Sequence, residues 1–267
     1  MVAKQGKSKD FKRKITHKEY TFMSEEAKNM GIINEIKKEI THSDILNLTK
    51  RTGNKKTEAI YHADDRFMCL QVDKKSLPIM FGGFCLFLAV GFTIILTTAT
   101  DDTASGLGYK ITTLLLYIGF LFFFIYYFSM PSKEHIYDRL NSLTTFPGFM
   151  WHKNITMPIK KIAFNYSQPS AQGIGSYELR IVRPDKMYSQ FIGVSFGQEY
   201  YKDLSFFLWY MDKNRPLPPG AAFDEFRDRD FERRKAEGFP KPLFPSRFET
   251  PEATDKQPAE RLMIGGW

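Results

Sequence analysis

The residues best suited to chemistry lie close together near the C-terminal end of the sequence, in residues 223–235 (FDEFRDRDFERRK). Four carboxylates there could hold a cation or act as an acid–base pair: Asp224, Glu225, Asp228 and Asp230. Four arginines alternate with them and would neutralise their charge: Arg227, Arg229, Arg233 and Arg234. Alternating charges around a few phenylalanines are typical of a solvated helix with local ion pairs. We therefore interpret this stretch as structural rather than catalytic.

Other signatures of catalysis or cofactor binding are absent from the sequence. The segment AQGIGS, with Gly173 and Gly175, resembles a phosphate-binding loop only superficially, because the third glycine and a following helix are missing. P-loop, GxSxG and HExxH motifs do not occur. No two of the five histidines have metal-ligand spacing: His17, His42, His62, His135 and His152. The sequence thus predicts a non-enzymatic protein with no catalytic residue, no cofactor, no metal site and no small-molecule substrate.

Two long apolar segments organise the rest of the chain. Residues 77–98 contain no charged residue in 22 positions, and residues 111–130 contain none in 20. Either segment can cross a hydrocarbon core of about 30 Å at about 1.5 Å per residue. We predict a transmembrane hairpin over residues 77–130, with a connecting loop at residues 99–110. The alternative, two buried helices of a soluble protein, would require two uninterrupted apolar helices unusually close together.

The charges that flank the hairpin predict its orientation. Lys74 and Lys75 precede the first span, and Lys133 and Arg139 follow the second, whereas the connecting loop carries two aspartates and has Lys110 only at its edge. Basic residues are retained on the cytoplasmic side during insertion. We therefore expect a multi-pass protein of a bacterial inner (plasma) membrane with both termini in the cytoplasm. Neither span contains an ionisable residue of the kind that ion pathways need, so an anchoring role is expected.

Residues 1–76 form a basic arm, which we expect on the cytosolic side. The arm holds 17 Lys and Arg against 11 Asp and Glu, in a chain of net charge +8. Its first 18 residues are polar enough to predict disorder, and they lack the interleaved aromatic residues of a nucleic-acid tail, so no nucleic-acid partner is expected. A short helix is predicted over Glu25–Ile40, capped by Ser24. The two cysteines, Cys69 and Cys85, provide no disulfide framework, which fits a reducing compartment.

Residues 131–220 change to short alternating segments, which predict a cytosolic antiparallel β-rich domain. Asn141-Ser142 is the predicted turn of a first hairpin, and residues 198–213 form one amphipathic helix that RPLPPG ends. Strands are predicted at residues 66–72, 136–139, 143–146, 159–166, 177–182 and 188–196. Several strands followed by one helix predict an α+β membrane protein with a pleckstrin-homology-like (PH-like) domain. A single flat sheet in an α+β sandwich is the alternative.

Residues 221–267 combine the charged helix with a Pro-rich tail. The tail carries four apolar side chains, Phe239, Leu243, Phe244 and Phe248, which a tail exposed to solvent would not need. We expect this tail to wrap over the domain or to bind a partner in extended form. The chain ends in LMIGGW, whose terminal tryptophan could dock on a partner or on the same domain. Our predicted partner contacts are Phe244, Phe248 and Trp267.

Three short motifs carry a family resemblance: IYDRL at residues 136–140, LSFFLWYM at residues 204–211 and RPLPPG at residues 215–220. With them, the chain resembles uncharacterised bacterial two-span inner-membrane proteins that are found near type VI secretion effectors. The resemblance covers the outline of most of the chain and implies an immunity protein. It implies no catalytic residue. The long basic N-terminal arm and the segment PLFPSRFETPEAT depart from the pattern.

These observations lead to a functional expectation with two alternatives. We expect an inner-membrane protein, bound to the lipid bilayer, whose cytosolic domain binds a partner protein and neutralises a toxin or effector by occlusion. The first alternative is a membrane-anchored regulatory module that binds lipid or the membrane surface. The second is a membrane-acting toxin. Aromatic residues and arginine are favoured at protein-binding hot spots, which supports the protein-binding expectation.

Overall fold

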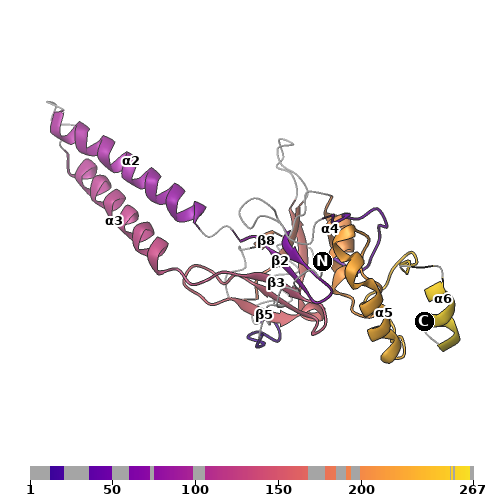
Figure 1. Cartoon of the computed structure of the whole chain (residues 1–267). Coiled ribbons are helices and arrows are strands. Elements are labelled where there is room, and N and C mark those ends of the chain that lie inside the picture. Colours follow the sequence, from indigo (N-terminus) through magenta and orange to yellow (C-terminus); the bar gives the residue numbers. More distant parts are fainter. Residues whose placement is uncertain are drawn as a thin grey trace, which may run out of the picture. The chain divides into compact units, whose positions relative to one another are not determined.

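The computed structural model describes the following residues: 13–20, 36–49, 60–72, 75–98, 106–167, 178–184, 191–193, 199–252, 254 and 256–264. They belong to two compact units. We call the first the hairpin unit, which comprises Val72–Glu134 and Pro147–Asn154. The second is the sheet unit, which comprises Met1–Gln71, His135–Phe146 and Ile155–Trp267. Figure 1 labels the elements of both units.

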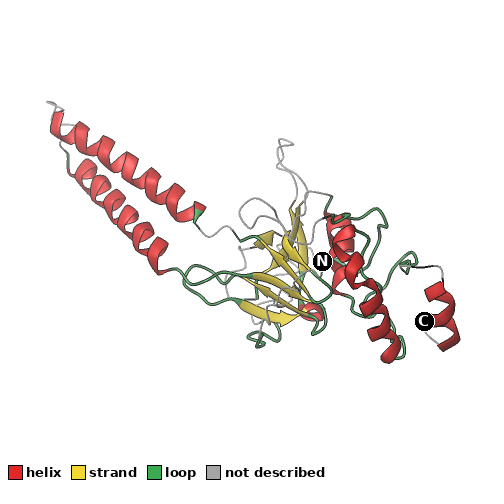
Figure 2. Cartoon of the chain, viewed as in Figure 1, coloured by secondary structure: helices red, strands yellow, loops and turns green. Residues whose placement is uncertain are grey.

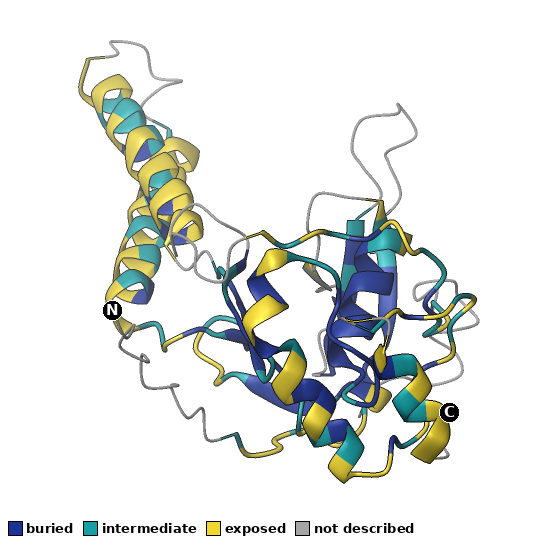
Figure 3. Ribbon diagram, turned by 45° about the vertical axis from the view of Figure 1, so that its right-hand side comes forward, coloured by how far each residue is buried: buried dark blue, intermediate teal, exposed yellow. Residues whose placement is uncertain are grey.

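The hairpin unit contains two long helices that run side by side, α2 (Ser76–Thr98) and α3 (Leu107–Ser129) (Figure 1). Each has 23 residues and is apolar enough to cross a membrane, which confirms the two predicted helices. Small residues allow the helices to approach closely. A Cβ atom added at Gly82 would lie 3.2 Å from Phe123 Cβ, and one added at Gly119 would lie 3.3 Å from Cys85 Sγ. The outward faces of both helices are uncovered (Figure 3). Only 11% of the most apolar 18-residue stretch of either helix is buried within the protein.

The larger sheet of the sheet unit has five antiparallel strands in sequential order. They are β1 (Ile60–Ala63), β2 (Phe67–Leu70), β3 (His135–Asp138), β4 (Leu143–Phe146) and β5 (Ile155–Pro158) (Figure 2). The predicted hairpin at residues 136–146 and the predicted strand near residues 66–72 are confirmed. β2 pairs with β3 from Phe67↔Asp138 to Leu70↔His135. The predicted domain boundary at residue 76 placed β2 and β3 in separate segments of the chain. In the structure they are neighbours in one sheet, because the hairpin is inserted between them.

A second, three-stranded sheet follows, with the order β6 (Phe164–Ser167), β7 (Glu178–Val182) and β8 (Phe191–Gly193). The prediction of one continuous strand over residues 159–166 was wrong. Ile159–Lys161 instead form a 3₁₀ turn (η1) between the two sheets. Ile159 and Ile162 are both buried, and their i, i+3 spacing places two apolar side chains on one side of such a turn. The predicted strand at residues 177–182 is confirmed, and most of residues 188–196 lie outside the described residues.

The predicted closing helix is α4 (Tyr200–Met211), and it is covered on more than one side (Figure 3). Its apolar face packs into the core, where the Phe207 ring lies 4.5 Å from that of Tyr137. The opposite side is also covered, since Trp209 Nε1 donates to Pro216 O at 2.9 Å and the Trp209 ring lies 6.5 Å from that of Phe248. Tyr201 is 42% exposed, although its spacing to Leu204 and Leu208 had predicted that it lies on the buried face of the amphipathic helix. The helix is buried nearly all round because the C-terminal segment covers the face that the sheets leave open.

The C-terminal segment consists of η2 (Ala221–Phe226), α5 (Arg227–Ala236), an extended stretch and α6 (Lys256–Ile264). The extended stretch meets the N-terminal part of the chain, where Ile40 N donates to Pro245 O at 2.9 Å and Arg247 N donates to Ile40 O at 3.1 Å. Residues 36–40 are thus extended, so the end of the predicted helix over Glu25–Ile40 was wrong. The remainder of that predicted helix lies outside the described residues. Although the isoleucines of this segment have helical spacing, its backbone hydrogen bonds to the tail stabilise a non-helical conformation instead.

Candidate functional site

A fully buried arginine from the β3–β4 turn organises the C-terminal segment. Arg139 has no exposed surface, and its guanidinium donates to backbone carbonyl oxygens at the end of α4. Nε lies 2.8 Å from Tyr210 O, and a terminal nitrogen lies 2.6 Å from Arg215 O. The last carbonyls of a helix lack intrahelical partners, so this side chain acts as a C-terminal cap. The other terminal nitrogen donates to Asp230 on α5.

Asp230 is the central carboxylate of this network. Besides Arg139, it accepts from Arg233 and Arg234, each at 3.0 Å. Burial alone would raise the pKa of Asp230, but the charges of Arg139, Arg234 and Arg233 outweigh burial and hold the pKa below its ordinary value. The carboxylate is therefore ionised at neutral pH inside the protein. We call the set Arg139, Asp230, Arg233, Arg234, Glu252 and Arg261 the arginine network.

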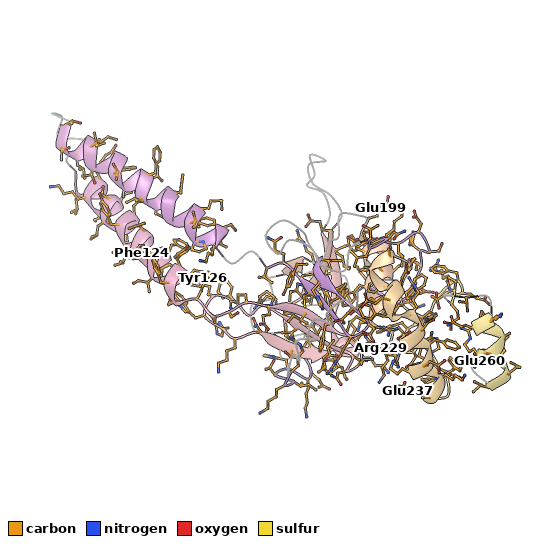
Figure 4. The ribbon with its side chains drawn as sticks, in the orientation of Figure 1. Phe124, Tyr126, Glu199, Arg229, Glu237 and Glu260 are labelled. Atoms are coloured by element: carbon orange, nitrogen blue, oxygen red, sulfur yellow. The ribbon has the colours of Figure 1, made fainter. Side chains whose placement is uncertain are left out.

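The network continues from α5 to α6 through Glu252. Arg234 binds this carboxylate with two parallel hydrogen bonds of 2.8 and 2.7 Å, the geometry that a guanidinium fork favours. Arg261 of α6 donates to the same carboxylate at 3.2 Å. Burial tends to lower the pKa of Arg234, but Glu252 and Asp230 raise it above its usual value. A second link between α5 and α6 is the ion pair of Lys235 with Glu260. Figure 4 labels Glu260.

A separate buried pair, Asp212 and Arg215, holds the extended stretch. The Asp212 carboxylate accepts from the backbone nitrogens of Leu243 at 2.8 Å and Phe244 at 3.2 Å, and from Arg215 at 3.2 Å. Burial raises the pKa of Asp212 even though Arg215 and the backbone donors act in the opposite direction. Arg215 in turn donates to Phe244 O at 2.8 Å. The tail is therefore fixed to the end of α4 by its backbone.

These contacts test the interpretation of residues 223–235. The expected local ion pairs are present, with Asp224 to Arg227 at 2.9 Å and Asp230 to both Arg233 and Arg234. The expected solvated helix was wrong for one face of α5, where Asp230, Phe231 and Arg234 are buried. Arg139 explains the difference, because it brings a compensating charge from a distant turn. Sequence reasoning missed Arg139 as a member of this site, since a lone arginine in a turn carries no local signal of burial.

The surface of this segment carries a cleft with a volume of about 400 Å³. Its apolar lining comes from Trp209, Leu217, Pro219 and Pro251, and its polar lining comes from Asp224, Arg227, Asp228 and Glu252. The Arg227 guanidinium is committed to Asp224 and to three backbone carbonyls, those of Leu217, Pro218 and Gly220. The Glu252 carboxylate is committed to Arg234 and Arg261. Exposed Asp228 therefore gives the cleft an acidic rim over an apolar floor.

The three predicted partner contacts have different outcomes. Phe244 is 4% exposed and belongs to the core, so its ring is not offered to a partner in this structure. Phe248 is half-buried, and its ring lies 6.5 Å from that of Trp209, which lines the cleft. Trp267 lies outside the described residues. The four apolar residues of the tail indicated contacts with the domain or a partner, but they did not distinguish the inward side chain from the surface one.

The histidines occupy five separate environments. His62 contacts Asp64 at 3.0 Å, and buried His135 accepts or donates a hydrogen bond with the Tyr137 hydroxyl at 2.7 Å. Burial lowers the pKa of His135 to about 3. The other three contact Thr16, Thr41 and Phe149 O. Within the described part of the chain, no group of three or more His, Cys, Asp or Glu side chains could hold a metal ion. Gly173 and Gly175 lie outside the described residues.

Comparison with known proteins adds no relative. No family model, no curated protein and no solved structure matches the chain. The site must therefore be interpreted from its own geometry. That geometry is a charged network that fixes a C-terminal segment and leaves an acidic, apolar-floored cleft on its surface.

Proposed function

We propose that this chain is a non-enzymatic membrane-anchored protein whose sheet unit binds a partner protein through the cleft. α2 and α3 serve as the anchor because their apolar side chains are largely uncovered and would be poorly solvated in water. The most specific form of this proposal is an immunity protein of a bacterial inner membrane that occludes a type VI secretion effector. The motifs that resemble such proteins lie on β3, α4 and the proline-rich turn after α4.

The strand pairing supports a hairpin with both ends on one side of the membrane. β2 precedes α2, β3 follows α3, and the two strands are hydrogen-bonded neighbours in one sheet. Two paired strands must lie on the same side of a bilayer, so the chain has to cross it an even number of times between them. The flanking basic residues Lys75 and Lys133 favour the cytoplasm as that side. We therefore place the sheet unit in the cytoplasm.

The order of elements supports a PH-like arrangement of the sheet unit. Two antiparallel sheets of sequentially ordered strands are followed by one helix whose side chains enter the core. The membrane hairpin would then be an insertion between the second and third strands of the domain. The segment after Met211 would be an addition that covers the outer face of the closing helix.

The lining of the cleft indicates the chemistry of the partner. Trp209 and Leu217 form the floor of the cleft and are each only 2% exposed, so the apolar surface open to a partner comes mainly from half-buried Pro219 and exposed Pro251. Asp228 is exposed at the rim. A lysine or arginine side chain fits this combination, because its alkyl part can lie on the apolar surface while its charge meets the carboxylate. This acidic, tryptophan-floored cleft is the observation that carries the proposal.

A charge reversal at the rim tests the cleft. Cells that express a candidate type VI secretion effector should survive with the wild-type protein and lose that protection with Asp228→Lys. The matched control is Glu232→Lys, because Glu232 is an exposed acid on the same helix that does not line the cleft. Membrane levels of both variants should be compared by immunoblot. Equal protection by both variants would exclude the cleft as the binding surface, and unchanged resistance after gene deletion would exclude the immunity role itself.

A further inference from the structure

A second built surface lies in the hairpin unit, at the loop Pro147–Asn154, which we call the Trp151 loop. The Trp151 ring packs edge-on against two rings of α3, at 5.4 Å from Phe122 and 4.9 Å from Tyr126. Its indole Nε1 donates to Ser129 Oγ at 2.8 Å. These three α3 residues have i, i+4 and i+7 spacing and so share one face of the helix. The indole therefore lies along the last two turns of α3, where Figure 4 labels Tyr126.

Several constraints fix the shape of the loop. The Lys133 ammonium is 7% exposed and donates to Gly148 O at 2.7 Å and His152 O at 2.6 Å. A Cβ atom at Gly148 would lie only 2.0 Å from Lys153 O, so only glycine permits this approach. Met150 has a φ of 40°, a left-handed conformation that a non-glycine residue keeps only when its surroundings impose it. The loop is thus held in one conformation, and Trp151 is presented from a fixed position.

The exposed side of the loop combines apolar and cationic groups. Trp151 is 43% exposed in spite of its contacts with α3, and Lys153, two residues further along the loop, is also exposed. A tryptophan has an apolar ring with one polar N–H, and it is enriched where hydrocarbon meets lipid headgroups. A lysine in the same loop can reach headgroup phosphates. This pairing of side chains suits a phospholipid interface better than either bulk water or a dry protein contact.

The depth of the loop along α3 also fits the interface. Ser129 is the last residue of α3, and Phe122 lies seven residues earlier, about 10 Å along the helix axis. At the adjacent start of α2, the Lys75 ammonium lies 4.8 Å above the Tyr127 ring, a cation and an aromatic ring at the same level. The indole is therefore part of an aromatic and basic band at one end of the hairpin. Such bands mark the membrane–water boundary.

We propose that the Trp151 loop inserts its indole into the boundary between headgroups and acyl chains of the bilayer that the hairpin crosses. The inference rests on the proposed anchoring role of α2 and α3 and adds a third membrane contact from a distant part of the sequence. A third contact beside the two helices restricts the rotation and tilt of the hairpin. The loop then fixes the depth of the hairpin in the bilayer. The Trp151 ring lies at the boundary between headgroups and acyl chains, and the Lys153 ammonium lies among the phosphates.

Quenching of tryptophan fluorescence by brominated lipids tests this placement. The full-length protein is reconstituted in phosphatidylcholine vesicles that carry bromine either near the headgroup end or near the methyl end of the acyl chains. We expect stronger quenching by the shallow bromines. Most of the quenchable emission should be lost in Trp151→Phe and retained in Trp267→Phe, the matched control. An unquenched Trp151 component with both lipids, or stronger quenching by the deep bromines, would overturn the inference.

A parallel measurement separates failure of the inference from failure of the anchor. Cys85 lies in α2, and the only other cysteine, Cys69, is buried in β2. If the hairpin spans the bilayer, an impermeant maleimide should leave Cys85 unmodified in vesicles and should modify it after addition of sodium dodecyl sulfate. If Cys85 is protected from the maleimide but Trp151 is not quenched, the interfacial placement of the loop is wrong and the anchoring role of α2 and α3 still stands. Modification of Cys85 in intact vesicles rejects both.

Discussion

In α2 and α3 the apolar side chains face outward, whereas in α5 and its surroundings charged side chains face inward. Phe87, at the middle of α2, is 75% exposed, and Arg234 on α5 is 1% exposed. Both arrangements depart from the usual pattern of a soluble protein. The two regions differ in what surrounds those side chains. The hairpin requires a medium outside the protein, whereas the arginine network supplies its own partners from within the chain.

This contrast shows that the exposure or burial of a side chain is favourable or costly according to the groups that surround it. An exposed phenylalanine is well solvated if lipid surrounds it, and a buried arginine is well solvated if carboxylates and carbonyl oxygens surround it. Arg139 receives such partners from α4 and α5, which lie far from it in the sequence. The hairpin should therefore be sensitive to the insertion of charge, and the network should be sensitive to its removal. Four predictions test this difference.

The largest effect is expected when one partner of the arginine network is removed. Asp230→Ala leaves Arg139 and Arg234 buried without their shared carboxylate. Breaking a buried ion pair by removing one partner destabilises proteins by about 3–5 kcal/mol. Denaturant titration of the protein in detergent, followed by tryptophan fluorescence, should show this loss. Asp228→Ala on the same helix is the control, and since Asp228 is exposed, its change should stay within about 0.5 kcal/mol. Similar stability of both variants would show that the network does not support the fold.

The next effect concerns charge in the hairpin. Phe87→Asp places a carboxylate at the middle of α2, where membrane insertion should lose about 3 kcal/mol. The fraction of protein that resists alkaline extraction from membranes should fall, while Phe87→Leu should leave it unchanged. Equal extraction of both variants would indicate that this face of α2 does not contact lipid.

A third prediction uses pH to probe a buried group without a charged partner. The pKa of His135 is lowered from an ordinary 6.5 to about 3 by burial, so the unfolded chain takes up a proton on acidification before the folded chain does. Stability is fully present above pH 6.5 and falls as the pH drops toward 3, with about 2 kcal/mol lost by pH 5. Unfolding titrations between pH 8 and pH 5 measure this loss. His135→Gln should reduce the dependence on pH, whatever its effect at pH 8. An unchanged slope would assign the acid sensitivity to other groups.

The smallest effect concerns the packing of α2 on α3. Gly82→Ala adds a methyl group 3.2 Å from Phe123 Cβ, an atom fixed to the α3 backbone, and should weaken the hairpin by up to about 1 kcal/mol. Gly83→Ala is the matched control, because no atom lies within 4 Å of its added Cβ. Unfolding by sodium dodecyl sulfate should separate the two variants. A hairpin that tolerates both changes equally would indicate that close approach at Gly82 contributes little.

Features encoded by neighbouring residues could be predicted from the sequence. The two apolar helices follow from uninterrupted apolar runs, and the β3–β4 hairpin follows from strand patterns around Asn141-Ser142. Contacts between distant segments could not be predicted. No periodicity indicates that Arg139 meets Asp230, or that β2 pairs with a strand beyond the hairpin. The side of a Pro-rich tail that faces inward is likewise set by its backbone contacts with Asp212, which explains the placement of Phe244 in the core.

The insertion of the hairpin between β2 and β3 constrains how the protein is made. When β2 leaves the ribosome, its partner β1 is already present but its other partner, β3, is still unsynthesised, because residues 71–134 come first. At 5–20 residues per second, that delay lasts on the order of several seconds. During this time α2 and α3 are synthesised before the five-stranded sheet can close. The sheet can therefore be completed only after both helices have been synthesised, and a chain that is interrupted within the hairpin leaves the β1–β2 pair with an open edge where β3 would bind.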